Sequence, residues 1–354
     1  MTITRTADMK LDVTLYVSRL RDVPEAARAA EALGFDGLWV GEVQHDPFQV
    51  LALAAEHTER IELGTAVAIA FARSPAVLAY SAWDLAALSG GRFNLGLGTQ
   101  VKAHIERRFG MPWEAPVPKL REAIQGIRAF WDCWQHGTRL NWRGRFYTFT
   151  LMTPFFNPGP IEHPAIPIYI AGVNARLCRL AGEVADGFHV HPFHTREYLQ
   201  QVILPAIMAG PAASGRGRDD IQLATAAFAI VGESEAERAR VREEVRRQIA
   251  FYGSTPSYRA VWAHHGWEAT GGRLSALAAR GQWAEMPGAI SDEQLDAFAV
   301  SGTWEEVAVR LQARYAGLLD RLALYPPFIP GQDEAGWQRF IVAFRQNQQE
   351  KGTL

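Results

Sequence analysis

The stretch that decides the fold is IELGTAVAIAFARSPAVLAYSAWDLAALSGGRFNLGLGTQ, residues 61–100. Residues 61–66 and 92–98 have the short apolar pattern of buried strands. Residues 74–91 between them form an apolar helical segment, with Ser74 as N-cap and Pro75 at the first helical position. Two strands joined by a helix lie parallel, with a right-handed crossover. This stretch therefore predicts one βαβ unit, with an unusually apolar connection over residues 67–72.

The same alternation continues in both directions along the chain. Strands are predicted at residues 11–18, 36–42, 61–66, 92–98, 166–172, 185–191, 221–231 and 319–327. Helices are predicted at residues 23–35, 46–58, 74–91, 116–137, 173–184, 234–252 and 334–349. Eight strands that alternate with helices fit a closed (β/α)8 TIM barrel, an α/β fold occupying residues 1–354 as one domain. A doubly wound dinucleotide fold is the weaker alternative, because no G-x-G-x-x-G motif follows the first strand.

Two stretches interrupt the alternation. Residues 138–165 are rich in Trp, Phe and Pro, and residues 253–300 are rich in Gly and carry three tryptophans. Long connections inside compact domains are usually functional, so we expect both to be insertions at the C-terminal face of the barrel. A packing brace or a dimer surface is an equal alternative. Aromatic residues in and near the first insertion predict a large apolar substrate pocket: Trp113, Trp142, Phe146, Tyr147, Phe155 and Phe156.

Composition narrows the possible partners and location. The 354 residues are 48% hydrophobic with a net charge of −2, so no large basic surface for nucleic acid is expected. Cys133 and Cys178 are isolated, which fits buried thiols in a reducing compartment. The first residues lack an apolar signal segment, and no apolar run approaches the roughly 20 residues of a membrane span. We expect a cytoplasmic protein whose partner is a small molecule, with no nucleic acid and no membrane.

Half of the ten histidines fall at three predicted strand ends: His45, His104, His189, His191 and His194. In a TIM barrel the chemistry sits at the C-terminal ends of the strands. A lone histidine is usually structural, but five on one rim favour a functional role for at least one. Two chemistries suit them: metal-dependent hydrolysis through His189-x-His191, or redox chemistry with an organic cofactor. The first strand lacks the His pair with which such hydrolases open, so no metal ligands are assigned.

The chain resembles the luciferase-like flavin and deazaflavin oxidoreductases. EALGFDGLWVGE, the stretch 61–100 and IPIYIAGVNARLCRLAGEVADGF carry this resemblance, in family order. The ordered set is specific although each motif alone is weak. HDPF, AFARSP, LSGGRF and VKAHIERRFGMPW are similar to the branch that uses the deazaflavin coenzyme F420. The resemblance implies a bacterial-luciferase-like barrel.

The resemblance also implies a cofactor site. In the family the third strand ends in a non-proline cis peptide against the central ring of the isoalloxazine, and the matching bond is Ala66–Val67. A flat ring needs such an apolar platform of small residues; an overlong strand followed by an ordinary turn is the alternative. The cofactor phosphate would lie at the helix start that follows the fifth strand. The other implied cofactor-binding residues are Thr99, Gln100, Gly172, Val173, Asn174 and His189.

The catalytic residues implied by the resemblance lie on the same rim. Relatives often have an acidic residue followed by a histidine after the second strand. Here Glu42 fills the acidic position, while Val43 follows it and His45 is displaced by two residues. An imidazole could move the substrate proton as hydride moves to or from the deazaflavin. A glutamate that follows the fourth strand in sugar-phosphate dehydrogenases of the family has no match here, because Val101 occupies its place, with His104 and Lys102 as nearby substitutes. A sugar phosphate is therefore not the expected substrate.

The expected activity is F420-dependent hydride transfer to or from a small, apolar or aromatic organic substrate. Basic residues near the rim would hold the anionic tail of F420: Lys102, Arg107, Arg108 and Arg176. The main alternative is an FMN-dependent two-component monooxygenase served by a flavin reductase, because both cofactors fit one platform. A barrel that binds flavin without catalysis and the metal-dependent hydrolase are further alternatives. The resemblance also implies a homodimer to which residues 74–91 contribute.

Overall fold

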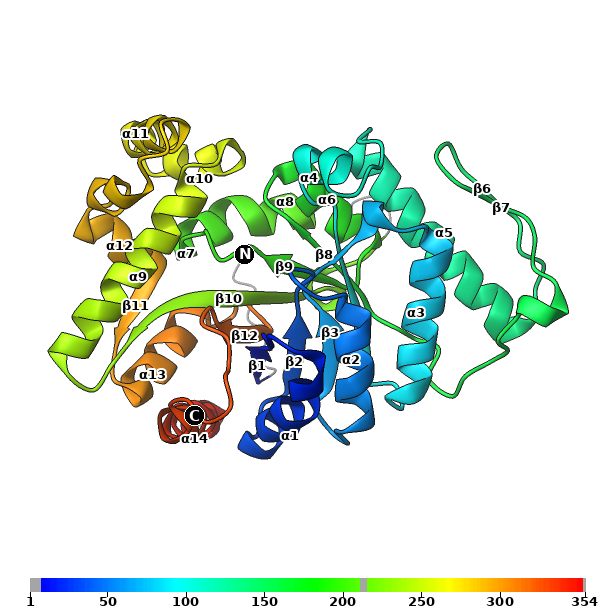
Figure 1. Cartoon of the computed structure of the whole chain (residues 1–354), viewed down its shortest axis with the longest axis horizontal. Coiled ribbons are helices and arrows are strands. Elements are labelled where there is room, and N and C mark those ends of the chain that lie inside the picture. Colours follow the sequence, from blue (N-terminus) through cyan, green and yellow to red (C-terminus); the bar gives the residue numbers. More distant parts are fainter. Residues whose placement is uncertain (1–7, 211–214, 353–354) are drawn as a thin grey trace.

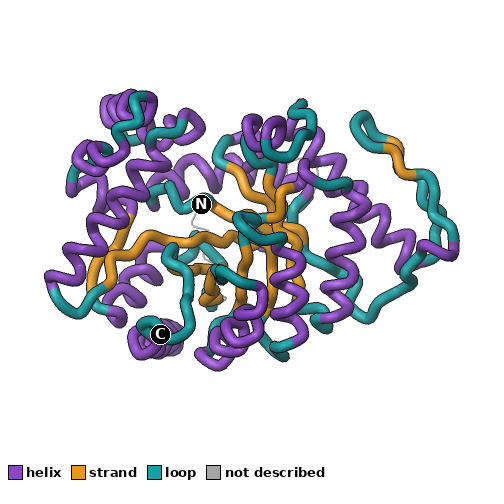
Figure 2. Tube along the Cα trace, in the orientation of Figure 1, coloured by secondary structure: helices purple, strands orange, loops and turns teal. Residues whose placement is uncertain are grey.

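A computed structural model describes residues 8–210 and 215–352, the last two without their side chains. Its main sheet has ten strands, of which β4 pairs only with β5 and β11 only with β10. The other eight pair in parallel around a closed ring, because β10 joins β9 and β12, and β12 joins β1 (Figures 1 and 2). In ring order they are β1 (Lys10–Thr14), β2 (Gly37–Val40), β3 (Glu62–Thr65), β5 (Phe93–Gly98), β8 (Ile168–Gly172), β9 (Gly187–Val190), β10 (Gln222–Val231) and β12 (Arg321–Leu324). The predicted TIM barrel is confirmed.

Helices follow the barrel strands and surround them. They are α1 (Val23–Leu33), α2 (Pro47–Glu56), α3 (Pro75–Leu88), α4 (Lys102–Arg107), α5 (Pro116–His136), α6 (Ala175–Val184), α7 (Arg196–Tyr198), α8 (Leu204–Met208), α9 (Glu235–Gly253), α13 (Trp304–Tyr315) and α14 (Glu334–Gly352). The helix starts read from sequence are confirmed, since the side chains of Asp46 and Ser74 accept backbone N–H groups of α2 and α3. Gly34 ends α1 with a φ of 96°, a conformation that favours glycine.

The second insertion, residues 253–300, is mostly helical. It contains α10 (Arg259–His264), α11 (Glu268–Ala279) and α12 (Asp292–Phe298), and it ends in β11 (Ala299–Gly302), which extends the sheet beside β10. Trp262 is buried and its indole donates to the Gly253 carbonyl oxygen, so it anchors the insertion to the end of α9. Apolar packing, rather than glycine content, therefore decides the structure of this segment.

The first insertion, residues 138–165, does not cap the barrel as predicted. It forms a hairpin of β6 (Trp142–Arg143) and β7 (Thr148–Phe149) beyond α5, at the right of Figure 1. The Tyr80 hydroxyl of α3 donates to the Phe156 carbonyl oxygen, and the Trp83 indole donates to that of Gly159. From α5, the Glu122 carboxylate accepts from the Arg145 N–H and the Gln135 side chain accepts from the Ile161 N–H. The segment is thus fastened along the outside of α3 and α5, which matches the alternative of a packing brace.

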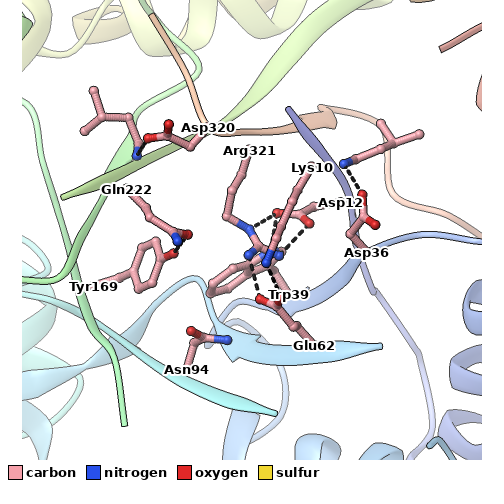
Figure 3. A network of polar contacts seen from close by, with 12 residues as sticks. Lys10, Asp12, Asp36, Trp39, Glu62, Asn94, Tyr169, Gln222, Asp320 and Arg321 are labelled. Carbon is pink, nitrogen blue, oxygen red and sulfur yellow. Dashed lines mark hydrogen bonds and ion pairs between the residues drawn. The ribbon is translucent and has the colours of Figure 1, made fainter. Parts of the chain in front are cut away.

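An ion network fills the N-terminal end of the barrel interior (Figure 3). Arg321 of β12 is 1% exposed and donates to both carboxylate oxygens of Asp12, at 2.7 and 2.8 Å. It also donates to Glu62 at 2.6 Å, while the Trp39 indole donates to Asp12 at 2.7 Å. Although burial opposes the charged form of Glu62, the nearby Arg321 and Lys10 cations leave its pKa below the usual value. The barrel is thus closed at this end by paired charges.

Two structural findings bear on the expectations that were drawn from composition. Both cysteines are buried and free, as predicted. Within the part of the chain that the structure describes, no helix is long and apolar enough to cross a membrane. The cytoplasmic location stays a prediction.

Candidate functional site

A cavity of about 570 Å³ opens at the C-terminal ends of the barrel strands. All eight residues predicted to bind the cofactor line this one cavity: Ala66, Val67, Thr99, Gln100, Gly172, Val173, Asn174 and His189. They come from the ends of β3, β5, β8 and β9, which the closed sheet brings together. A larger hollow lies at the opposite, N-terminal end of the barrel, beside Pro167 and Asp186. Active sites of this fold lie at the C-terminal end instead.

The segment that follows β3 forms one wall of the cavity and has the predicted bulge. The Ala66–Val67 peptide bond is cis, as expected, and β4 (Ala68–Ile69) then pairs with β5. Glu42 holds this segment in place, because its backbone N–H donates to the Val67 carbonyl oxygen and its carboxylate accepts from the Ile69 N–H at 2.8 Å. Arg73 donates to the same carboxylate at 2.6 Å. The apolar connection is therefore an ordered wall of the cavity.

Two glycines of β5 let the wall close. A side chain at Gly96 would meet the Thr65 carbonyl oxygen at 1.8 Å, and one at Gly98 would meet the Val67 side chain at 2.5 Å. The Thr65 side chain joins β3 to β5 at this point. Its hydroxyl donates to the Gly96 carbonyl oxygen at 2.6 Å and accepts from the Gly96 N–H at 2.8 Å. Small residues here leave the face of the Ala66–Val67 segment open to a flat ligand.

His189 lies deep in the cavity, above the barrel's aromatic core. Its ring is 4.8 Å from that of Trp39 and 5.1 Å from that of Tyr169. Burial, and then the Arg321 cation, lower the pKa of His189 to about 3, so its imidazole is neutral at physiological pH. Its buried Nε2 has no hydrogen-bond partner among the described residues. A buried polar atom without a partner is costly, and a bound ligand would relieve that cost.

The helix that follows β8 is capped by one of the predicted residues. The Asn174 side chain accepts from the N–H groups of Arg176 and Leu177, so the helix start is partly satisfied by the chain itself. A second hollow, of about 610 Å³, adjoins the cavity and shares Pro116 and Val117 with it. Arg176 and Arg179 line this hollow and are exposed. Positive charge therefore extends outward from the cavity mouth.

The three predicted catalytic residues lie outside the cavity lining. Glu42 supports the bulge as described above. The His45 ring is hydrogen bonded to the Ser18 carbonyl oxygen at 3.3 Å, and His104 is exposed on α4. Among the basic residues expected at the rim, Lys102 lines the cavity and Arg176 the adjoining hollow. The catalytic roles of Glu42, His45 and His104 stay predictions.

The sequence placed His191 on the rim but missed Tyr258, which faces it across the cavity edge. Tyr258 comes from the second insertion, and its hydroxyl lies 2.9 Å from His191 Nε2. No local pattern marks this tyrosine, since the contact joins residues 67 positions apart. Of the six aromatic residues predicted to line the substrate pocket, only Trp113 does so. The other five all belong to the segment outside α3 and α5, and two of them, Phe155 and Phe156, are largely exposed.

The histidines of the rim are not gathered as metal ligands. His191 Nδ1 accepts from the Phe193 N–H, and its Nε2 is paired with Tyr258. In residues 8–210 and 215–352, no group of three or more His, Cys, Asp or Glu side chains could hold a metal ion. The described arrangement is one of neutral imidazoles, aromatic rings and small residues.

Comparison with known proteins places the chain in a family. The luciferase-like monooxygenase model matches residues 3–321. An uncharacterised protein of Mycobacterium tuberculosis (strain H37Rv) is 44% identical over 92% of this chain and 95% of its own length. The 5,10-methylenetetrahydromethanopterin reductase of Archaeoglobus fulgidus is 30% identical, covering 80% of this chain and 83% of that protein.

Solved structures show the same fold. The coenzyme F420-dependent tetrahydromethanopterin reductase from Methanopyrus kandleri has a TM-score of 0.77 and 20% identity, covering 94% of this chain and 97% of that one. A riboflavin lyase solved with modified FMN and riboflavin has a TM-score of 0.75 and 16% identity, covering 96% and 92%. Because the family model covers most of the sequence and the barrel agrees, the chain belongs to the luciferase-like monooxygenase family of oxidoreductases.

Proposed function

We propose that the protein is a coenzyme F420-dependent oxidoreductase that transfers hydride between the deazaflavin and a small apolar or aromatic organic substrate. The observation that carries the proposal is the convergence of all eight implied cofactor positions on one cavity of about 570 Å³. This volume is within the range of ordinary small-molecule sites. Trp113, Val117 and Tyr258 give the rest of the wall its apolar character.

The residues present suit a deazaflavin. The Ala66–Val67 segment with Gly98 beside it offers a flat, narrow platform, and His189 offers a neutral polar atom without a partner. F420 would supply the hydride acceptor or donor, and the protein's part is to hold the ring and exclude water. The adjoining hollow with Arg176 and Arg179 suits the anionic tail of F420. This hollow favours F420 over FMN.

The direct test is titration of the purified protein with F420 and, separately, with FMN, followed by tryptophan fluorescence. Trp113 is the tryptophan of the cavity lining as the structure describes it, among 11 in the chain. We expect micromolar binding of F420, and a Trp113→Phe variant should lose much of the fluorescence change while absorbance shows binding within about threefold of wild type. Preference for FMN would instead favour a two-component monooxygenase with a reductase. Binding of neither cofactor would refute the redox proposal.

The basic hollow separates the two cofactors. Replacing Arg176 and Arg179 together by alanine should weaken F420 binding about five- to tenfold, because charged contacts to the tail are lost. FMN binding should change less than twofold. Because both arginines are exposed, the F420 effect should shrink in 0.5 M salt, where charges are screened within about 4 Å. Arg273→Ala, at an exposed position of α11, is the matched control. Equal losses for both cofactors would contradict a tail site here.

The homodimer stays a prediction, as does the dependence on a flavin reductase if FMN is the cofactor. The exposed face of α3, with Val77 and Leu88, is consistent with the proposed contribution of this helix to a dimer. Sedimentation of the purified protein would decide its oligomeric state.

A further inference from the structure

His191 and Tyr258 form a pair at the cavity edge that none of the assigned roles uses. Tyr258 ends η7 (Pro256–Tyr258), the turn between α9 and α10 (Figure 1). Its ring packs against those of His191 and Phe193, with centroids at 4.7 and 5.3 Å, and against the edge of Tyr252. Three neighbouring rings therefore fix the direction of the Tyr258 phenol. Both His191 and Tyr258 line the cavity that contains the Ala66–Val67 platform.

The backbone decides which nitrogen of His191 carries the proton. The Phe193 N–H donates to His191 Nδ1 at 3.1 Å. A backbone N–H can only donate, so Nδ1 must be unprotonated. The same bond excludes the imidazolium ion, in which both nitrogens carry protons. Consistently, burial and then the neighbouring His194 lower the pKa of His191 to about 3. His191 is thus the neutral tautomer with its proton on Nε2.

This tautomer sets the direction of the next hydrogen bond. His191 Nε2 lies 2.9 Å from the Tyr258 hydroxyl oxygen and must donate to it. The hydroxyl oxygen is therefore an acceptor in this bond, and its own proton is available to another acceptor. Among the described residues, His191 is the hydrogen-bond partner found for this hydroxyl. The neighbouring Tyr252 hydroxyl is instead bonded to Tyr325 at 2.7 Å.

We propose that Tyr258 donates its hydroxyl proton in a hydrogen bond to an oxygen acceptor of the substrate, and that His191 is the positioning residue that sets this direction. The substrate class is accordingly a small molecule with a carbonyl-type oxygen, rather than an unactivated alkene. The role of this hydrogen bond in hydride transfer rests on the proposed function, whereas the hydrogen bond itself does not depend on it. A donor on the carbonyl oxygen draws electron density from the carbon, as hydride addition to that carbon requires.

The test compares two probes of the same shape. 4′-Fluoroacetophenone has a carbonyl oxygen where 4-fluoro-α-methylstyrene has a CH₂ group, so only the ketone can accept a hydrogen bond. Their dissociation constants are measured by ¹⁹F NMR titration of the wild-type protein, with and without F420. Tyr258→Phe should reduce the preference for the ketone about fivefold, the worth of one neutral hydrogen bond. Tyr252→Phe, the matched control, should leave the preference unchanged.

A second measurement does not depend on any ligand. Long-range ¹H–¹⁵N NMR of protein labelled at histidine nitrogens should show His191 with its proton on Nε2, identified by the signals lost in His191→Gln. Protonation on Nδ1 would overturn the inference, as would an unchanged ketone preference in Tyr258→Phe. Weaker F420 binding in Tyr258→Phe with an unchanged ketone preference would also overturn it, because the hydroxyl would then serve the cofactor. Failure of F420 to bind, with the ketone preference lost in Tyr258→Phe, would refute the proposed function alone.

Discussion

Asp12→Ala is expected to lower the free energy of unfolding by about 3–5 kcal/mol, because it leaves the Arg321 guanidinium buried without its main partner. Asp12 is 2% exposed and Arg321 is 1% exposed, and two hydrogen bonds join them. The substitution also removes the acceptor of the Trp39 indole. Glu62 remains as one partner of Arg321, so the barrel should still form. Urea denaturation at 25 °C, followed by circular dichroism, measures the loss.

The controls separate charge burial from the loss of one side chain. Asp22→Ala breaks an exposed pair with Arg19, which solvent and salt screen, so its effect on the free energy of unfolding should be far smaller than that of Asp12→Ala. Replacing both buried partners, as Asp12→Leu with Arg321→Met, should recover much of the stability, since no charge is then left unpaired. A loss below 1 kcal/mol for Asp12→Ala would show that water or another group reaches Arg321.

Gly98→Ala is expected to weaken F420 binding about 10- to 100-fold. The added methyl group would lie 2.5 Å from Val67 Cγ2, so the Val67 side chain must move and change the platform. Overpacking of this kind typically costs about 1–3 kcal/mol, and each 1.4 kcal/mol is a factor of ten in affinity. The dissociation constant is measured by absorbance titration, with thermal unfolding of the same samples to follow stability.

A compensating substitution makes this prediction sharper. Val67→Ala removes the atoms that the new methyl group would meet, so the double variant should regain most of the lost affinity. Gly272→Ala is the matched control, because a side chain there meets nothing within 4 Å. If the double variant binds F420 as weakly as Gly98→Ala alone, the Val67 side chain is not the cause of the loss.

The sequence by itself determined the barrel. Every barrel strand and most of the surrounding helices carry their own signal, such as the apolar run of β5 or the Asp46-Pro47 start of α2, and the helix caps act within three residues of chain. The helices α4, α7, α8 and α13 were not predicted. Family resemblance then indicated eight positions, and all eight line the cavity, because strand ends in a closed parallel sheet must meet. Local signals and a fixed topology are therefore enough to predict the barrel and to bring these eight positions together.

Only the tertiary structure decided which side chains face the cavity and which support it. Glu42 and His45 both follow β2, yet Glu42 holds the bulge after β3 and His45 is hydrogen bonded to Ser18. The first insertion lies outside α3 and α5, whereas the second supplies Tyr258. The direction of the Tyr258 proton depends on the Phe193 N–H, the His191 ring and a turn 67 residues further along. Such contacts join segments distant in sequence, so packing, and no local pattern, determines them.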